Sequence, residues 1–350
     1  MSEIGQAIET ARRAKGWTQG DLAEVAGVTQ AALSRYENDL RTPDSEQLKT
    51  LADALGVTPA LLLHAGRIRG GLAVSAHMRR DKSARPTTWR MLEARLNMTR
   101  LHASRLFEEV SLTAESQVPT FDPDAQAPAD AARLVRAQWR MPLGPVRSLI
   151  SWMEAAGILV IEDDFGQGAR VDGMSQWVDD HPVILINSAV PTDRKRWTLA
   201  HELGHLVMHS NFIDDDAEDQ ANSFAGEFLM PADEIRPTLH NIKLGTLLDL
   251  KRSWGVSIAA LIERAHGLGC MTPAQRSSMY KMMNARGIRR DEPGSAGLPA
   301  ETPRLAAHIA QALQSKGLDA HEIASLAGFP RPEDNTLFPV EAPRRLRAVL

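Results

Sequence analysis

Residues 198–210 read TLAHELGHLVMHS and contain the pattern His-Glu-x-x-His. Two histidines four residues apart on a helix point to the same side, so His201 and His205 can share one metal ion. Glu202 follows the first histidine, where its carboxylate can take a proton from a metal-activated water that attacks a carbonyl. The stretch therefore predicts a helix that carries a zinc site for the hydrolysis of peptide bonds.

A catalytic zinc needs a third protein ligand, and the next segment supplies several candidates. Residues 217–229 predict a second helix with an apolar stripe, and Glu218 lies one turn before that stripe. An antiparallel helix that crosses the first one would direct such a carboxylate at the metal. From spacing alone the other candidates stay open: Asp214, Asp215, Asp216, Asp219, Glu227 and His209. His209 lies about 6 Å farther along the first helix than His205, which we expect to be too far to share the ion.

The run PVILINSAVPTDRKRWTLAHELGHLVMHS, followed by EDQANSFAGEFLMP, resembles the ImmA/IrrE-type metallopeptidases. The resemblance implies that His201, His205 and Glu218 bind zinc and that Glu202 is the general base. It also implies a protein substrate, usually a DNA-bound helix-turn-helix repressor that is cut in response to damage or stress. Many relatives carry a second glutamate where this chain has Gln220, a departure that touches no implied ligand.

Two short apolar runs precede the motif helix and predict strands, ILVIED at 158–163 and HPVILIN at 181–187. We expect 181–187 to lie beside the zinc as an exposed edge strand, which could hold an extended peptide by backbone pairing. An ordinary core strand is the alternative. Both descriptions can hold, because an edge strand can pack one face inward.

Residues 3–63 show a different pattern, in which short apolar-periodic segments begin at Thr or Ser and stop at Gly. This pattern predicts about five short helices that include a helix-turn-helix, whose second helix, 29–37, would enter the major groove of DNA. Glutamine can pair with adenine and arginine with guanine, while a helix start can clamp a phosphate. The residues expected to contact DNA are Gln19, Thr29, Gln30, Ser34, Arg35 and Asn38.

The run W-T-Q-x-x-L-A-x-x-A-G-V-T-Q-x-x-L-S-R-Y-E-N resembles the Cro/cI-type (XRE) DNA-binding domain over residues 4–63. This implies operator DNA as a partner and, by analogy, a homodimer, although some such domains serve for dimerisation or protein contact instead. Residues 1–66 carry 6 basic and 9 acidic side chains, whereas 67–106 carry 10 basic and 2 acidic ones. The basic segment could attract phosphate or could pack as a solvated helix against the acidic domain, and both alternatives remain open.

The bulk properties predict a soluble protein of several units. The chain has 350 residues and net charge −4, and its one cysteine, Cys270, excludes an internal disulfide. No stretch resembles a signal peptide or approaches the 18 or so apolar residues that span a membrane, so we expect a cytoplasmic protein.

The predicted fold class is α+β and mostly α-helical. Four regions are expected: a five-helix helix-turn-helix domain (1–66), a basic helical connector with an acidic linker (67–130), an HExxH zincin-like peptidase domain with a small β-sheet (131–270) and a helical C-terminal region (271–350). Further helices are predicted at 75–112 with a break at Pro86, at 194–209 and at 242–265.

One internal echo links the two ends of the chain. A shift of 301 positions overlays residues 4–28 on the tail, with Lys15-Gly16 on Lys316-Gly317 and Ala26-Gly27 on Ala327-Gly328. Both stretches predict a helix, a glycine turn and a short helix. Prolines at 330 and 332 come next in the tail, so we do not expect a second DNA-reading helix there.

Two functions of different class are compatible with these patterns. The first is a DNA-binding transcriptional regulator that is also a zinc-dependent metalloendopeptidase acting on a protein, with a repressor as the expected substrate. The alternative is a transcription factor whose zinc domain is a non-catalytic sensor or a protein-interaction module of toxin–antitoxin type. Glu202 favours the first, because a structural zinc has no use for a general base.

Overall fold

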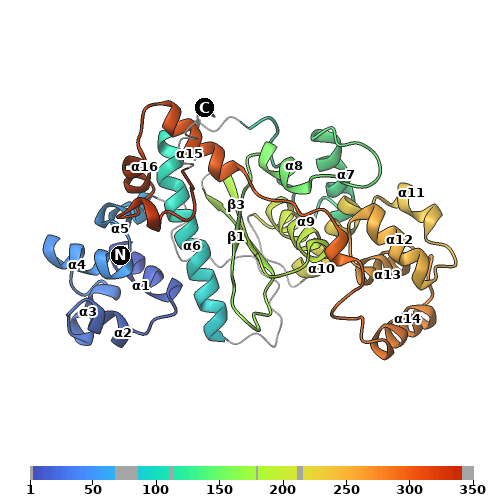
Figure 1. The fold of residues 1–350 in the computed structure, drawn as a ribbon, viewed down its shortest axis with the longest axis horizontal. Helices are drawn as coiled ribbons and strands as arrows, with labels where there is room; N and C mark the ends of the chain where they lie inside the picture. The colour runs from blue at the N-terminus through green and yellow to red at the C-terminus, as the bar shows by residue number, and fades with distance from the viewer. Residues whose placement is uncertain (1–2, 68–85, 111–113, 179, 211–215, 341–350) are drawn as a thin grey trace, which may run out of the picture.

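The fold is described from a computed structural model, in which residues 3–67, 86–110, 114–178, 180–210 and 216–340 are placed (Figure 1). Part of the predicted basic connector (68–85), the candidate ligands Asp214 and Asp215, and residues 341–350 lie outside the described residues. The molecule is mostly helical with one small sheet, so the predicted fold class is confirmed. Within the described part of the chain, no helix is both long and apolar enough to cross a membrane.

The N-terminal region folds into five short helices, as predicted. Their bounds are α1 Glu3–Ala14, α2 Gln19–Val25, α3 Gln30–Glu37, α4 Ser45–Leu55 and α5 Pro59–His64. Thr18 and Thr29 begin α2 and α3, where each side chain accepts a hydrogen bond from a backbone N–H three residues on. A buried ion pair, with Arg12 Nε 2.6 Å from Glu37 Oε1, ties α1 to the end of α3. The α2–α3 corner is therefore held firmly on α1.

The sheet has three strands: β1 Leu159–Asp163, β2 Gly173–Val178 and β3 His181–Asn187. Their order is β1-β3-β2, with β3 parallel to β1 and antiparallel to β2. The prediction that 181–187 forms an exposed edge is therefore wrong, because β3 pairs on both sides and is buried along nearly all its length. The edge strand that packs on the motif helix is β2, which the sequence did not predict.

Both faces of the sheet are covered. Alternate residues of each strand point to opposite sides, and each side packs into a separate core. Ile184 and Ile186 of β3 belong to the core shared with the motif helix, whereas Val183 and Leu185 belong to a second core on the other face. The helices that contribute to the first core are α7 Pro128–Gln138, α8 Leu149–Ala155, α9 Thr192–Met208, α10 Ala217–Leu229, α11 Ala232–Ile235, α12 Leu244–Trp254, α13 Ile258–Gly267 and α14 Pro273–Ala285. Those that contribute to the second core are α6 Pro86–Glu109, α15 Leu305–Ser315 and α16 Ala320–Leu326.

The helix predicted at 242–265 is broken into α12 and α13 at Gly255, which adopts a left-handed conformation with φ 66°. Lys251, on the last turn of α12 before this break, is fully buried. Its ammonium lies 2.6 Å from Asp193 Oδ2 and 2.9 Å from Glu292 Oε2. Glu292 also accepts the backbone N–H of Ile258 at the start of α13. Segments far apart in sequence are thus joined around the first turn of α9.

The long helix α6 lies between the N-terminal helices and the sheet (Figure 1). Of the helix predicted at 75–112 with a break at Pro86, the structure describes α6 from Pro86 to Glu109, and residues 75–85 lie outside the described residues. Arg95 donates from Nε to the carbonyl of Ala14 at the end of α1, and from Nη1 to Asp163 at the end of β1. One side chain therefore connects the N-terminal helices to the sheet.

The C-terminal helices α15 and α16 form a hairpin with the layout that the internal echo predicts. A shift of 301 residues places α2 (19–25) on α16 (320–326) with the same bounds. The hairpin's last carbonyls accept hydrogen bonds from three neighbours, namely Leu326 from Arg105, Ala327 from His102 and Gly328 from the backbone N–H of Thr58. The tail is therefore packed where α5 and α6 meet.

Candidate metal centre and nucleic-acid interface

Two close approaches place neighbouring elements against the motif helix α9. A Cβ added to Gly204 would lie 3.2 Å from the Cα of Ala221, so this glycine lets α10 cross α9 at short range. A Cβ added to Gly173 would lie 2.5 Å from Cγ2 of Thr198, so β2 also lies directly on α9. The crossing at Gly204 sets the position of Glu218, which lies one turn before Ala221 on α10.

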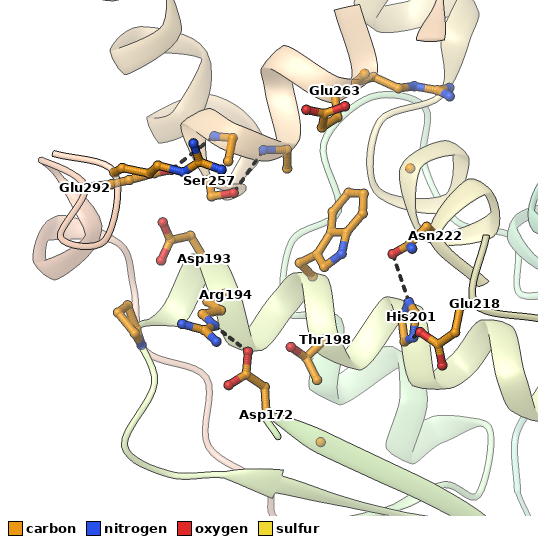
Figure 2. A pocket seen from close by; sticks show the side chains of 18 of the residues that line it. Asp172, Asp193, Arg194, Thr198, His201, Glu218, Asn222, Ser257, Glu263 and Glu292 are labelled. Atoms are coloured by element: carbon orange, nitrogen blue, oxygen red, sulfur yellow. Dashed lines mark hydrogen bonds and ion pairs between the residues drawn. The ribbon is translucent and has the colours of Figure 1, made fainter. Parts of the chain in front are cut away.

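The three predicted ligands meet at one point. The Nε2 atoms of His201 and His205 lie 3.1 Å apart, and each is 3.5 Å from a carboxylate oxygen of Glu218. Among the described residues, this is the one group of three or more His, Cys, Asp or Glu whose donor atoms all lie within 4.8 Å of one another. Figure 2 shows His201 and Glu218 side by side at the end of the cavity. The arrangement can hold one metal ion.

Glu202 lies beside this group and is buried. Ser175 of β2 donates its hydroxyl to Glu202 Oε2 at 2.7 Å. Burial raises the pKa of Glu202 to about 8, the Ser175 hydrogen bond acts against this rise and the carboxylate of Glu218 adds to it. Ser175 was not predicted from the sequence, since β2 itself was missed.

The other ring nitrogens of the two histidines face polar side chains. Nδ1 of His201 lies 3.1 Å from Oδ1 of Asn222 on α10. Nδ1 of His205 lies 3.1 Å from Nδ1 of His209, whose Nε2 lies 2.7 Å from Oε1 of Gln220. Sequence reasoning considered His209 as a rival ligand only, and it noted Gln220 only as a departure.

The described rival ligands do not belong to the three-donor group. Glu227 is buried and forms ion pairs with Arg133 and Arg264. His209 contacts His205 through Nδ1, on the opposite side of the His205 ring from Nε2. Asp216 and Asp219 are exposed near the start of α10.

In the N-terminal helices, α2 and α3 lie at one end of the molecule, far from α14 (Figure 1). Thr29, Gln30, Arg35 and Asn38 are exposed and Ser34 is half-buried. Four of the six predicted contacts have partners within the domain: Thr29 accepts the backbone N–H of Ala32, Ser34 accepts from Asn38, and Gln19 bonds to Glu37. Asn38 donates to the Ser34 carbonyl at 2.7 Å, and the amide of Gln19 donates to Glu37 Oε2 at 2.8 Å. Gln30 and Arg35 therefore form the most open part of the predicted reading surface.

Comparisons with known proteins agree with this division. Residues 153–266 match the family described as the IrrE N-terminal-like domain, and residues 8–62 match the helix-turn-helix family. The chain joins a helix-turn-helix DNA-binding domain to an IrrE-like metallopeptidase domain.

Each similar protein matches only part of this chain. The radiation response metalloprotease IrrE of Deinococcus radiodurans is 34% identical over 126 residues, which are 36% of each chain. The corresponding protein of Deinococcus deserti is 36% identical over 93 residues, 25% of this chain and 31% of that protein. The antitoxin HipB of Escherichia coli K12 is 37% identical over 49 residues, 14% of this chain and 52% of that protein. The chain thus spans about a third of the length of these IrrE proteins and about half of HipB.

The three-donor group of the IrrE-like domain opens onto a cavity of about 1260 Å³. His201 and Glu218 lie at one end, whereas Ser257, Glu263 and Glu292 lie on the opposite wall (Figure 2). Glu202 also lines the cavity. That wall continues into residues 280–295, beyond the boundary at 270 that the sequence suggested for the peptidase domain.

Proposed function

We propose that the IrrE-like domain is a zinc-dependent metalloendopeptidase, with His201, His205 and Glu218 as zinc ligands and Glu202 as the general base. The observation that carries the proposal is the convergence of three metal donors and one buried carboxylate at the end of a large cavity. The cavity exceeds the 300–1,000 Å³ or so of small-molecule pockets, which suits a polypeptide substrate.

The donor set fits zinc better than it fits the common hard cations. A tetrahedral zinc about 2.0–2.1 Å from its ligands holds them roughly 3.3 Å apart. The donors of this site are 3.1 Å and 3.5 Å apart. Two imidazoles with one carboxylate leave a fourth position for catalysis, whereas magnesium and calcium prefer oxygen ligands.

When bound, zinc supplies the Lewis acidity that strengthens water as a nucleophile and polarises the substrate carbonyl. Glu202 moves the proton, because its carboxylate can accept a proton from the attacking water and deliver it to the leaving amine. Ser175 holds Oε2 of this carboxylate, which leaves Oε1 for the proton. Burial makes Glu202 a stronger base, and a cation held by the neighbouring ligands would favour its ionised form.

The helix-turn-helix domain directs this peptidase to operator DNA. Gln30 and Arg35 are exposed on α3, where they can reach base edges in the major groove. A DNA-bound helix-turn-helix repressor is the substrate that best fits such a chain, because both proteins would then meet on DNA. A stress or damage response is suggested by the names of the Deinococcus relatives, and a homodimer by the helix-turn-helix domain.

The test compares the wild type with Glu202→Gln, using purified helix-turn-helix repressors from the same genome as probes. Incubation with Zn²⁺ should give new protein termini, detected by mass spectrometry, with the wild type only. Both proteins should hold one zinc per chain by elemental analysis. The exposed Glu234 gives a matched control, since Glu234→Gln should cleave as the wild type does.

Two results would overturn the proposal. Cleavage by Glu202→Gln at the wild-type rate would remove Glu202 from its role. A zinc-loaded wild type that cuts no repressor of the panel, while it still binds DNA, would favour the alternative of a transcription factor with a non-catalytic zinc domain.

A further inference from the structure

Behind the metal donors, three side chains form a continuous chain of contacts from α9 to α10. Nδ1 of His205 lies 3.1 Å from Nδ1 of His209, and Nε2 of His209 lies 2.7 Å from Oε1 of Gln220. Both histidines are fully buried, and Gln220 is half-buried. The contacts place two imidazoles and an amide in series, ending at the metal-facing edge of His205.

With the imidazoles neutral and Nε2 of both His201 and His205 left bare for a metal, the donors and acceptors in this series admit one consistent arrangement. A neutral imidazole has one N–H and one bare nitrogen. If Nε2 of His205 is bare for a metal, its Nδ1–H donates to Nδ1 of His209. The Nε2–H of His209 then donates to Oε1 of Gln220. In the reverse arrangement His205 would carry its proton on Nε2, where it would block the metal.

We infer that His209 and Gln220 are positioning residues that hold His205 in its metal-binding tautomer. The inference rests on the proposed function, because it takes His205 as a metal ligand. It also explains why His209 is buried four residues beyond His205 without belonging to the three-donor group. Partners of this kind, placed behind metal-ligating histidines, fix the ring and raise its basicity, and their loss typically weakens metal binding about 10- to 100-fold.

Gln220 does not contact the metal donors, and its role is to hold His209 in place. Gln220 lies on α10 two residues after Glu218, so one helix supplies a ligand and also holds the series that orients another ligand. Asn222, on the same helix, accepts from Nδ1 of His201. α10 therefore orients both histidines of α9 from behind.

The first experiment measures zinc affinity by competition with a chromophoric chelator, using the full chain. His209→Phe keeps a ring but removes both hydrogen bonds, and it should bind zinc about 10- to 100-fold more weakly than the wild type. His209→Asn keeps an acceptor for His205 and should recover most of this loss. Gln220→Leu should weaken binding in the same direction, by a smaller factor. The control His266→Phe, on α13, removes a similar imidazole contact to the Met271 carbonyl and should leave zinc affinity unchanged.

The second experiment needs no metal. Nitrogen NMR of histidine-labelled, metal-free protein should show His205 protonated on Nδ1 in the wild type and in His209→Asn, but as a mixture of tautomers in His209→Phe. Circular dichroism checks that each variant is folded, and His209→Asn and Gln220→Leu remain informative if His209→Phe is not.

Wild-type zinc affinity in His209→Phe, or an unchanged His205 tautomer in that variant, would overturn the inference. Failure of the proposed function looks different. A wild type that binds no zinc would refute the zinc site, while the NMR experiment would still report whether His209 sets the tautomer of His205.

Discussion

Two helix hairpins in this molecule share one layout and differ in the segment to which each is joined. α1–α2 turns at Gly16 with φ 72°, and α15–α16 turns at Gly317 with φ 96°. Thr18 and Asp319 begin the second helix of each pair, and both form a reciprocal capping box. The first hairpin leads into α3, whereas the second leads into a proline-rich turn. Local chemistry thus determines the hairpin, and the next segment determines whether it can present a reading helix.

The surroundings of the two hairpins also differ at their final glycines. A Cβ added to Gly27 would meet nothing within 4 Å, whereas one added to Gly328 would lie 2.5 Å from Cδ1 of Leu61 and 2.9 Å from its Cβ. The first glycine serves only the backbone turn. The second also allows the tail to dock on α5.

The largest expected effect is a difference in unfolding free energy between alanine substitutions of these two glycines. Gly27→Ala should cost about 1 to 2 kcal/mol of unfolding free energy, because φ 64° is unfavourable for alanine. Gly328→Ala adds a steric overlap to the same backbone strain and should cost about 2 to 5 kcal/mol. Urea unfolding of the full chain measures both. Equal losses would show that the tail does not dock tightly on Leu61.

A second effect should appear only at the C-terminal hairpin. His102 donates from Nδ1 to the Ala327 carbonyl at 2.6 Å and stacks on Phe329. Burial lowers the pKa of His102 from 6.5 to about 4. Between these values the unfolded chain binds a proton that the folded chain does not, so stability falls as pH drops from 6.5 to 4.

The loss attributable to His102 should be about 3 kcal/mol. His102→Asn retains a donor for the carbonyl but does not titrate, so it isolates this contribution from other acid effects. Unfolding free energies of the two proteins are compared at pH 7 and pH 4. The same pH dependence in both would rule out His102 as the cause.

A third effect should appear only in α3, the helix that follows the N-terminal hairpin. Arg35→Ala removes an exposed side chain from the predicted reading surface of α3 and should weaken operator binding about 10- to 100-fold. Arg331→Ala removes an exposed arginine that lies just beyond the second hairpin, and it should change the affinity less than twofold. Fluorescence anisotropy with a selected genomic DNA fragment measures both. Similar losses would point to general charge attraction.

The smallest effect should be shared by the two hairpins. Thr18→Ala and Asp319→Ala each remove a helix-capping side chain and should each cost about 1 kcal/mol of unfolding free energy. Thermal or urea unfolding measures the pair. A cost at one position that is several times the cost at the other would show that the two caps are not equivalent.

The N-terminal helices and the three metal donors could be predicted because their signals are local or carried by a family motif. Thr18 and Thr29 are typical helix-capping residues and predict where α2 and α3 begin. Helix periodicity alone places His201 and His205 on one face of α9. Glu218 was one of several candidates by spacing, and its assignment depended on the resemblance. In the structure it meets the histidines through the crossing at Gly204.

The missed features depend on long-range contacts or on weak local signals. β2 reads GMSQWV, which lacks a continuous apolar run, and without β2 the strand at 181–187 was wrongly expected at the edge of the sheet. Ser175 was missed with it. The role of His209 depends on Gln220 on another helix, so spacing along α9 could show only that His209 is too far to share the ion. Gly255 lay within an apolar-periodic stretch, where a left-handed break was not recognised.

Because the sheet is shared by two cores, its segment cannot be separated from both flanking regions without exposing apolar residues. The matched segment 153–266 supplies one covered face, while the opposite face, with Leu159, Val183 and Leu185, is covered by α6 and the C-terminal hairpin. A protein fragment limited to the matched segment would therefore expose an apolar sheet face to water. A recombination event that exchanged either flank would do the same, unless the new flank arrived with its own cover for the sheet.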